Sequence, residues 1–459
     1  MTPATEDLWF LPLGGTGEIG MNLNLYGHDG AWLMVDCGVT FKRTGEPGPQ
    51  VQMPDPGFIV ERRRQLQAIV VTHAHEDHVG AVAHLWPKLR CPVYTTPFTA
   101  EILKRKLAEA ELLGIVPLRI VAPRSRLTVG PFDLEWVNLT HSTPESQALV
   151  IRTGAGTVFH TGDWKLDPDP VVGPVFDRQR FEALGDEDVL AMVCDSTNAT
   201  VPGRSPSEAA LYRGLKAQVA GAPGRVVIAC FGSNVARLHT LAKLALHTGR
   251  HAGLLGRSLR TYHRAAVAAR VWDDRFRFID SRDLGYLPRH EVLAIATGSQ
   301  GESRAALDRL ASGTSRDFDL EPGDRVLFSS RVIPGNEPAV AALVDRLGER
   351  GVDVVQDEDC AEPIHASGHP AREELADMYR WVRPRTAIPV HGEDRHMAAH
   401  AALARELGVD RQLVGRNGDL FMLAPARGLR RGAAATGRLG LERDGLRPIA
   451  PRPETLTTG

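Results

Sequence analysis

The 459-residue sequence lacks the features of several protein classes. It has no apolar run near the roughly 18 residues that cross a bilayer, which argues against an integral membrane protein. The N-terminal segment MTPATEDLWFLPLGG carries acids where a secretory signal needs basic residues, so no signal is predicted. The five cysteines form no CxxC pair, which favours free thiols in a cytoplasmic protein over a disulfide framework. Basic and acidic side chains number 54 and 56, so charge balance alone does not indicate nucleic-acid binding.

The first 200 residues are instead dominated by short apolar or alternating segments separated by Gly and Pro, which predicts many short strands. Hydrophobic residues make up 43% of the chain and charged residues 24%, as in ordinary soluble globular proteins of two or three domains at this length. Several of the predicted strands end in a residue able to bind a metal or move a proton, namely Asp36, His73, His141, Asp163 and Asp195. We therefore expect a site along one edge of a sheet.

The pattern changes at residue 205. Ser205-Pro206-Ser207-Glu208 predicts a capped helix start, with Ser205 as the N-cap and Glu208 reaching back. Helical segments then alternate with strands to about residue 350, which is typical of a parallel α/β unit. Histidine-bearing segments like those of the first 200 residues return in HASGHP and TAIPVHGE. The expected division is a first domain interrupted by an inserted one: residues 1–205, 206–352, 353–426, and a basic C-terminal strand or tail at 427–459.

The strongest functional signal is the segment VVTHAHEDHVGA, in which His73, His75, Asp77 and His78 follow a predicted strand. Imidazole and carboxylate are ligands suited to zinc and its neighbours. Four such groups within six residues cannot all reach one ion comfortably, so the motif favours two ions. Hydrolytic enzymes place two metals about 3.5–4 Å apart to hold the attacking and leaving oxygens.

Further ligands are expected from other strand ends, at His141, Asp163 and His391, with Asp163 able to bridge two cations. His365 and His369 lie in the intervening HASGHP loop. Other candidates favour a structural role: His160 within a strand, His84 on a helical face, and Cys37 and Cys194 as small buried residues.

These motifs resemble those of the metallo-β-lactamase fold hydrolases, and the inserted domain with HASGH and VHGE resembles their β-CASP branch. LGGTGEIGMN, THSTPES, TVFHTGDWKLD, CDSTNAT, GRS, TGSQGE, IPGNE and NGD are similar to segments of the bacterial ribonuclease J family, and the matches span residues 13 to 419. The resemblance implies an αββα sandwich with an inserted α/β domain. Members commonly continue into a small C-terminal domain, whereas this sequence stops soon after GRLGLERDGLRPI, and Asp394 stands after HGE where an aromatic is common.

Residue by residue, the resemblance implies two zinc ions, with Mn²⁺ or Mg²⁺ as possible activating substitutes. His73, His75 and His141 would bind one ion, Asp77, His78 and His391 the other, and Asp163 would bridge them. Asp195 would support the site, and His369 would donate the proton to the leaving oxygen. Substrate contacts are implied for two loops: the scissile phosphate at His365, Ala366, Ser367, Gly368 and His369, and a 5′ phosphate at Gly232, Ser233 and Asn234.

The implied function is hydrolysis of single-stranded RNA in maturation and decay, 5′-to-3′ from 5′-monophosphate ends and with internal cleavage as a second mode, by a cytoplasmic homodimer that could work with other RNA-processing proteins. Alternatives are a DNA-directed nuclease, a small-molecule hydrolase or a non-catalytic RNA-binding subunit. The long insertion argues against a small-molecule hydrolase, and the intact metal-binding residues argue against a non-catalytic subunit. Some residues keep two interpretations: Asp195 and Ser233-Asn234 could serve only as caps, TGSQGE could be a turn or an RNA contact, and the nine arginines of 250–290 could form a solvated face or an RNA track.

Overall fold

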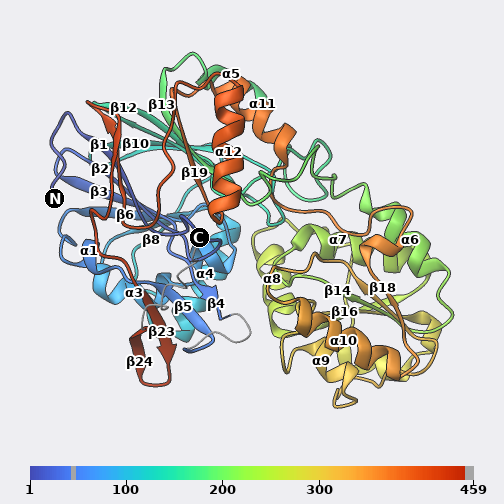
Figure 1. Cartoon of the computed structure of the whole chain (residues 1–459). Helices are drawn as coiled ribbons and strands as arrows, with labels where there is room; N and C mark the ends of the chain where they lie inside the picture. The colour runs from blue at the N-terminus through green and yellow to red at the C-terminus, as the bar shows by residue number, and fades with distance from the viewer. Residues whose placement is uncertain (43–47, 450–459) are drawn as a thin grey trace, which may run out of the picture.

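Two β-sheets stacked face to face form the larger lobe of the protein (Figure 1), in a computed structural model that describes residues 1–42 and 48–449. The first sheet has the order β22-β21-β1-β2-β3-β6-β7-β8. Its strands are Gly428–Arg430, Leu420–Ala424, Leu8–Gly14, Leu23–His28, Ala31–Val35, Leu66–Val70, Val93–Thr95 and Leu118–Ile120. The second has the order β20-β19-β13-β12-β11-β10-β9. Its strands are Arg411–Gln412, Thr386–Val390, Val189–Asp195, Gly156–His160, Gln147–Thr153, Phe132–Asn138 and Arg126–Val129.

Burial on both faces explains why the central strands have almost continuous apolar sequences such as AWLMV and VLAMVC. Phe10, Tyr26 and Leu33 of the first sheet meet Trp136 and Ile151 of the second in one buried cluster between the sheets. The outer faces are apolar as well, so each needs a covering layer of helices.

Helices cover both outer faces. The first sheet packs against α1 (Gly57–Val60), α3 (Val82–Leu89) and α4 (Pro97–Glu109), and the second against α5 (Arg178–Leu184), α11 (Arg372–Val382) and α12 (Asp394–Glu406). Figure 1 shows α5, α11 and α12 together on one outer side of the lobe. This four-layer arrangement confirms the predicted αββα sandwich.

The second lobe is a separate α/β domain with a five-stranded, entirely parallel sheet of order β15-β16-β14-β17-β18 (Figure 1). Its strands are His251–Leu255, Val292–Ala296, Val226–Ala229, Arg325–Phe328 and Asp353–Val355. Its helices are α6 (Leu211–Ala220), α7 (Val235–Thr248), α8 (Arg257–Ala268), α9 (Ala306–Ala311) and α10 (Glu337–Glu349), with short 3-10 turns η1 (Ser281–Tyr286), η2 (Arg289–Glu291) and η3 (Asp357–Asp359). The predicted inserted parallel α/β unit is therefore confirmed.

The predicted helix cap at Ser205 is wrong, because α6 begins at Leu211. Ser205 instead donates its amide to Glu374 at 2.7 Å and its hydroxyl to the His369 carbonyl at 2.6 Å. Glu208 does not reach back to a cap; its carboxylate accepts from Arg237 at 2.5 Å. Contacts with distant residues outweigh the local capping preference at this position.

The Arg237 side chain contacts both chain segments that connect the two lobes, one at Glu208 and the other at Ile364. Its guanidinium is fully buried, pairs with Glu208 of the first connection, and donates to the carbonyls of Ser329 at 2.8 Å and Ile364 at 3.4 Å. Ile364 belongs to the second connection and directly precedes the HASGHP loop. The Glu208 amide in turn donates to Asp167 of the sandwich at 2.8 Å.

A small sheet of order β24-β23-β5-β4 joins the end of the described chain to its beginning. β23 (Arg438–Glu442) and β24 (Gly445–Ile449) form a hairpin beside β5 (Val51–Pro54), which pairs with β4 (Thr40–Phe41) (Figure 1). A C-terminal strand is thus present, while residues 450–459 of the predicted tail lie outside the described residues. Within 1–42 and 48–449, no helix combines the length and hydropathy needed to cross a membrane.

Candidate metal centre

The predicted ligands lie where strands of both sheets end. His73 and His75 follow β6, and Asp77 and His78 lie in α2 (Glu76–Val79). His141 follows β10, Asp163 follows β12, and His391 comes directly after β19. The segment after β3 packs against α2 and requires a glycine at position 38, because a Cβ there would lie 1.7 Å from the Asp77 carbonyl oxygen.

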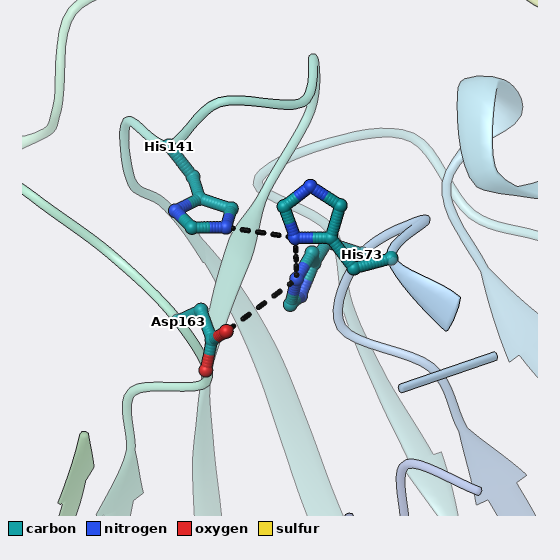
Figure 2. A group of neighbouring side chains, drawn as sticks. His73, His141 and Asp163 are labelled. Carbon is teal, nitrogen blue, oxygen red and sulfur yellow. Dashed lines mark hydrogen bonds and ion pairs between the residues drawn. The ribbon is translucent and has the colours of Figure 1, made fainter. Parts of the chain in front are cut away.

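The first group of ligand atoms comprises three imidazoles and one carboxylate. His75 Nδ1 lies 3.2 Å from His73 Nε2 and 3.0 Å from His141 Nε2. His73 Nε2 lies 4.0 Å from Asp163 Oδ2. Figure 2 shows His73, His141 and Asp163 directed toward one another from separate segments. One atom from each of the four residues lies within 4.8 Å of the others, a spacing that one metal ion can satisfy.

The second group contains Asp77, His78, Asp163 and His391 and has the same spacing. His391 Nε2 lies 3.2 Å from Asp77 Oδ2, and His78 Nε2 lies 3.2 Å from Asp163 Oδ2. His391 adopts a left-handed φ of 50°, and its amide donates to the Gly15 carbonyl at 2.6 Å. Asp163 belongs to both groups, so its two oxygens are placed between two adjacent sites.

Unsatisfied polar atoms support metal binding by these groups. Both ring nitrogens of His391 and Oδ1 of Asp163 are buried without a hydrogen bond to the described residues, although His391 Nδ1 and Asp163 Oδ1 are only 2.6 Å apart. Uncompensated buried polar atoms are costly, so a ligand that takes up their lone pairs would stabilise the site. The residues present therefore fit divalent metal ions.

The outer ring nitrogens have partners that orient the rings. His141 Nδ1 donates to the Gly368 carbonyl at 2.5 Å, and His78 Nδ1 donates to Asp36 Oδ2 at 2.7 Å. His73 Nδ1 lies 3.0 Å from the hydroxyl of Thr72, which itself donates to Asp36. These contacts leave Nε2 of His73 and of His141 facing the cluster with its lone pair available, as metal sites require. Nε2 of His78 also faces the cluster and lies 3.0 Å from the side-chain nitrogen of Asn22.

Burial and neighbouring charges divide the histidines into two kinds. Burial and the adjacent imidazoles hold the pKa of His73 and of His141 well below the usual range, and burial lowers the pKa of His75 to about 4. At His78 and His391 burial acts in the same direction, but the carboxylates, Asp163 foremost, outweigh it and raise the pKa. The three histidines of the first group are thus neutral and ready to bind a metal, while His78 and His391 of the second group must lose protons when a metal binds.

His369 and Asp195 form a pair beside the two groups. His369 Nδ1 donates to Asp195 Oδ2 at 2.7 Å and lies 3.9 Å from Asp163 Oδ2. Burial opposes the charged imidazole, but Asp195 and Asp163 outweigh it and raise the pKa of His369. Asp195 Oδ1 also accepts from the amide and hydroxyl of Thr197. Asp195 therefore caps its turn and orients His369 at the same time.

The HASGHP loop borders the metal groups. Asn198 donates to Ser367 Oγ at 2.8 Å and to the His369 carbonyl at 3.3 Å, which fixes the loop against the sandwich. Gly368 approaches closely, since a Cβ there would lie 2.7 Å from His141 Cε1. Ala366 is buried, and His365 Nδ1 is buried without a hydrogen bond in the described part of the chain.

The other predicted phosphate loop, Gly232–Asn234, begins helix α7 of the inserted lobe. Asn234 Oδ1 accepts from the Arg237 amide at 2.8 Å, so the predicted cap is formed. The Val235 amide donates to the Ser233 carbonyl at 2.9 Å, and the N-terminus of the helix as a whole favours an anion. A Cβ at Gly232 would lie 2.3 Å from Ser258 Oγ, which places this loop against the start of α8.

Comparisons with known proteins agree with this architecture. Residues 20–208 match the metallo-β-lactamase superfamily, 223–347 the β-CASP domain of ribonuclease J, and 361–413 the RNA specificity domain of zinc-dependent metallo-hydrolases. Ribonuclease J of Sinorhizobium meliloti is 47% identical over 92% of this chain and 75% of its own length. The chain belongs to the ribonuclease J family. The ribonuclease J proteins of Mycolicibacterium smegmatis and Thermus thermophilus are 40% and 36% identical over 93% and 90% of the chain, which covers 76% and 73% of their lengths.

A solved structure of a protein of unknown function from Enterococcus faecalis supports the fold alone, with a TM-score of 0.60 at 15% identity over 91% of this chain and all of that one. Membership of the metallo-β-lactamase superfamily implies divalent metal at the paired His and Asp groups.

Three residues that were predicted to have a structural role are buried in the protein. His160 lies with Nδ1 2.8 Å from the Tyr26 hydroxyl, and Cys37 and Cys194 are buried free thiols.

Sequence reasoning named Asp36 as a strand-end candidate without giving it a role, and it missed two further residues of this ribonuclease J family site. Asp36 holds His78 and Thr72, Asn198 holds the HASGHP loop, and Ser142 Oγ lies 3.2 Å from His75 Nε2. Asp36 ends a strand just as Asp163 does, so the same signal was available for it. The other two lie within THSTPES and CDSTNAT, where nothing in the spacing distinguishes them from turn residues.

Proposed function

We propose that this chain is a zinc-dependent ribonuclease that hydrolyses single-stranded RNA from 5′-monophosphate ends in the 5′-to-3′ direction and can also cut internally. The ribonuclease J relatives and the match to an RNA specificity domain support RNA as the substrate. Three four-residue groups share Asp163 at one sheet edge, and the observation that carries the proposal is the pair that contains the histidines of the H-x-H-x-D-H motif. Two adjacent metals suit in-line displacement at a phosphate.

The donor set favours zinc, because five imidazoles and two carboxylates converge and no thiolate takes part. Mn²⁺ and Mg²⁺ are the proposed activating substitutes. The proposed ligands are His73, His75 and His141 for one ion, Asp77, His78 and His391 for the other, and Asp163 for both. A bound metal pair would lower the pKa of a bound water toward neutral pH and would offset the negative charge of the phosphate.

In this proposal His369 is the proton donor. Its Nδ1 is held by Asp195, which leaves Nε2 to deliver a proton to the departing 3′ oxygen. Asp195 and Asp163 also raise the pKa of His369, which favours the imidazolium form that a proton donor needs. Proton delivery to that oxygen yields a 3′ hydroxyl on one product and a 5′ phosphate on the other.

Two loops are the proposed substrate contacts. His365, Ala366, Ser367, Gly368 and His369 would border the scissile phosphate, because this loop touches His141 through Gly368. Gly232, Ser233 and Asn234 would hold the 5′ phosphate at the start of α7, where helix amides favour an anion. A terminal monophosphate fits a single such loop, which is the basis of the proposed end preference.

The test compares RNA carrying a 5′ monophosphate with the same RNA carrying a 5′ triphosphate, labelled at the first nucleotide. Early release of labelled mononucleotide from the monophosphate substrate alone is expected, with loss of activity in chelator and in Asp163→Ala. Asp163→Ala should keep the unfolding transition of the parent chain measured without metal. Wild-type turnover by that variant would refute the bridging role of Asp163.

Further arms of this experiment test the alternatives. Equal attack on DNA would redirect the proposal to a DNA-directed nuclease, and hydrolysis of thioesters without nuclease activity would favour a small-molecule hydrolase.

We also propose a cytoplasmic homodimer, to be tested by light scattering and cell fractionation. The division at 1–205, 206–352, 353–426 and 427–459 stays a proposal that limited proteolysis can test.

A further inference from the structure

The side chain of Glu374 is fully buried on α11 and lies outside the metal groups and the two proposed phosphate loops. Within residues 1–42 and 48–449 its carboxylate forms no ion pair. A buried carboxylate without a partner cation is costly unless hydrogen bonds compensate it. Burial raises the pKa of Glu374, and three main-chain amides and the Lys165 ammonium oppose that rise.

The three amides come from three separate segments. The Leu166 amide donates to Oε1 of Glu374 at 2.8 Å, and the Ser205 and Ala371 amides donate to Oε2 at 2.7 and 2.9 Å. Only the contact with Ala371 is local, and it serves the start of α11 in the manner of a helix cap. The other two contacts reach residues 208 and 169 positions away in the sequence, so the carboxylate does more than begin its own helix.

Two of the three segments hold the main chain of the proposed proton donor. The Ser205 hydroxyl donates to the His369 carbonyl at 2.6 Å, and Ala371 follows His369 by two residues. The same oxygen of Glu374 therefore fixes the chain on both sides of this histidine. The ring of His369 in turn lies 3.9 Å from the carboxylate of Asp163.

The third segment carries two of the candidate metal ligands. Leu166 follows Asp163 by three residues. The amide of its neighbour Lys165 donates at 2.8 Å to the carbonyl of Thr140, the residue before His141. One carboxylate thus connects the ends of the strands that carry metal ligands to the loop that carries the proton donor.

We propose that Glu374 is a positioning residue, which fixes His369 at the separation from Asp163 that proton delivery requires. The inference rests on the proposed function and adds a residue that contacts no substrate and no reacting atom. Glu374→Gln exposes this role, because an amide side chain has a single acceptor oxygen. The NH₂ group that replaces the other oxygen meets an N–H donor in either orientation, so at least one of the three contacts is lost.

The test compares two reactions that differ in their need for a proton. The departing 3′ oxygen of RNA must be protonated, whereas bis(4-nitrophenyl) phosphate releases a stable phenolate that leaves without a proton. In the metal-loaded full chain, Glu374→Gln should lower kcat on RNA about 10- to 100-fold and change kcat on the nitrophenyl ester by less than about twofold. Its metal content in elemental analysis should equal that of the parent chain.

Glu373→Gln is the matched control. Glu373 precedes Glu374 on α11, but its side chain is 62% exposed and lies 3.4 Å from Arg204 at the surface. This control should change neither rate. An unchanged kcat on RNA in Glu374→Gln would overturn the proposal. An equal loss on both substrates would also overturn it, because that pattern indicates damage to the metal centre or to the fold.

Ser205→Ala is a second, independent variant. It removes the hydroxyl contact to the His369 carbonyl and leaves the carboxylate of Glu374 in place. The same preference for loss on RNA is expected, with a smaller magnitude because one contact to the histidine is removed. If Glu374→Gln does not fold, this pattern in Ser205→Ala supports the proposal and its absence overturns it.

Hydrogen exchange separates this inference from the proposed function. Amide exchange is followed by mass spectrometry across residues 365–371 of the metal-loaded chain. Glu374→Gln should accelerate exchange in this segment about tenfold, and Glu373→Gln should leave it unchanged. Faster exchange supports the positioning role even if the parent chain cleaves no RNA. Unchanged exchange overturns that role even if the parent chain proves to be a ribonuclease.

Discussion

Replacing Arg237 with methionine should weaken the junction of the two lobes by about 3–5 kcal/mol. The guanidinium is fully buried and Glu208 is only 4% exposed, so the substitution leaves a carboxylate inside the protein without its partner. The carbonyls of Ser329 and Ile364 lose a donor at the same time. An unpaired buried charge costs far more than a lost surface ion pair, which is why the expected loss is large.

The assay is urea unfolding of the metal-loaded chain, followed by tryptophan fluorescence and by proteolysis at the two connections. Arg204→Met is the matched control, because Arg204 is about half exposed and pairs with Asp377 on the surface at 2.6 Å. That control should cost about 0–1 kcal/mol. The double variant Arg237→Met/Glu208→Gln should recover part of the loss, since it removes the stranded charge. Similar losses in Arg237→Met and Arg204→Met would refute the reasoning.

Three further predictions concern the metal centre and its support, and a fourth concerns the buried His400 of α12. Asp36→Asn should lower metal affinity about 10- to 100-fold, because His78 loses the carboxylate that fixes its tautomer, and a competition titration with unchanged affinity would contradict this. Gly38→Ala should abolish metal loading in elemental analysis, because the new Cβ would collide with the Asp77 carbonyl; full occupancy would show that the loop can move. Chelation should lower the melting temperature by removing a stabilising ligand, worth about 4 kcal/mol at a thousandfold excess over Kd, and an unshifted transition would argue against bound metal. Burial lowers the pKa of His400 from 6.5 to about 4, so as the pH falls protons bind the unfolded chain before the folded one. This difference should lower the free energy of unfolding by about 2 kcal/mol between pH 7.5 and 5. His400→Gln should flatten that pH dependence, and an equally steep profile would exclude His400 as its source.

The convergence of the candidate metal ligands could be predicted because their signal is local. A His or Asp at the end of an apolar strand can be recognised without knowing the fold, and parallel packing then brings such ends together, as it does for Asp163 and His391. The alternation of helices and strands likewise predicted the inserted domain. Both inferences depend on short-range patterns that tertiary contacts reinforce.

What could not be predicted depends on contacts between distant residues. Arg237 lies in NVARLHTLAKLA and has the appearance of an ordinary helix former, yet its partners are 29 and 127 residues away in sequence. The same limit applies to the arginines of 250–290. Arg275 and Arg282 pair with acids two residues away, whereas Arg257 faces the cleft between the lobes, and composition alone cannot separate these cases.

The Arg237 side chain reaches both Glu208 and Ile364, so the two chain segments that connect the lobes lie close together. Because the chain leaves the sandwich and returns to it at nearly the same point, a short turn could replace the whole parallel α/β unit without separating any paired strands of the sandwich. A single genetic insertion at that point could therefore have converted a compact ancestral hydrolase into an enzyme with a second wall over its reaction centre. Later changes to that wall could alter the range of substrates while the ancestral scaffold stayed intact.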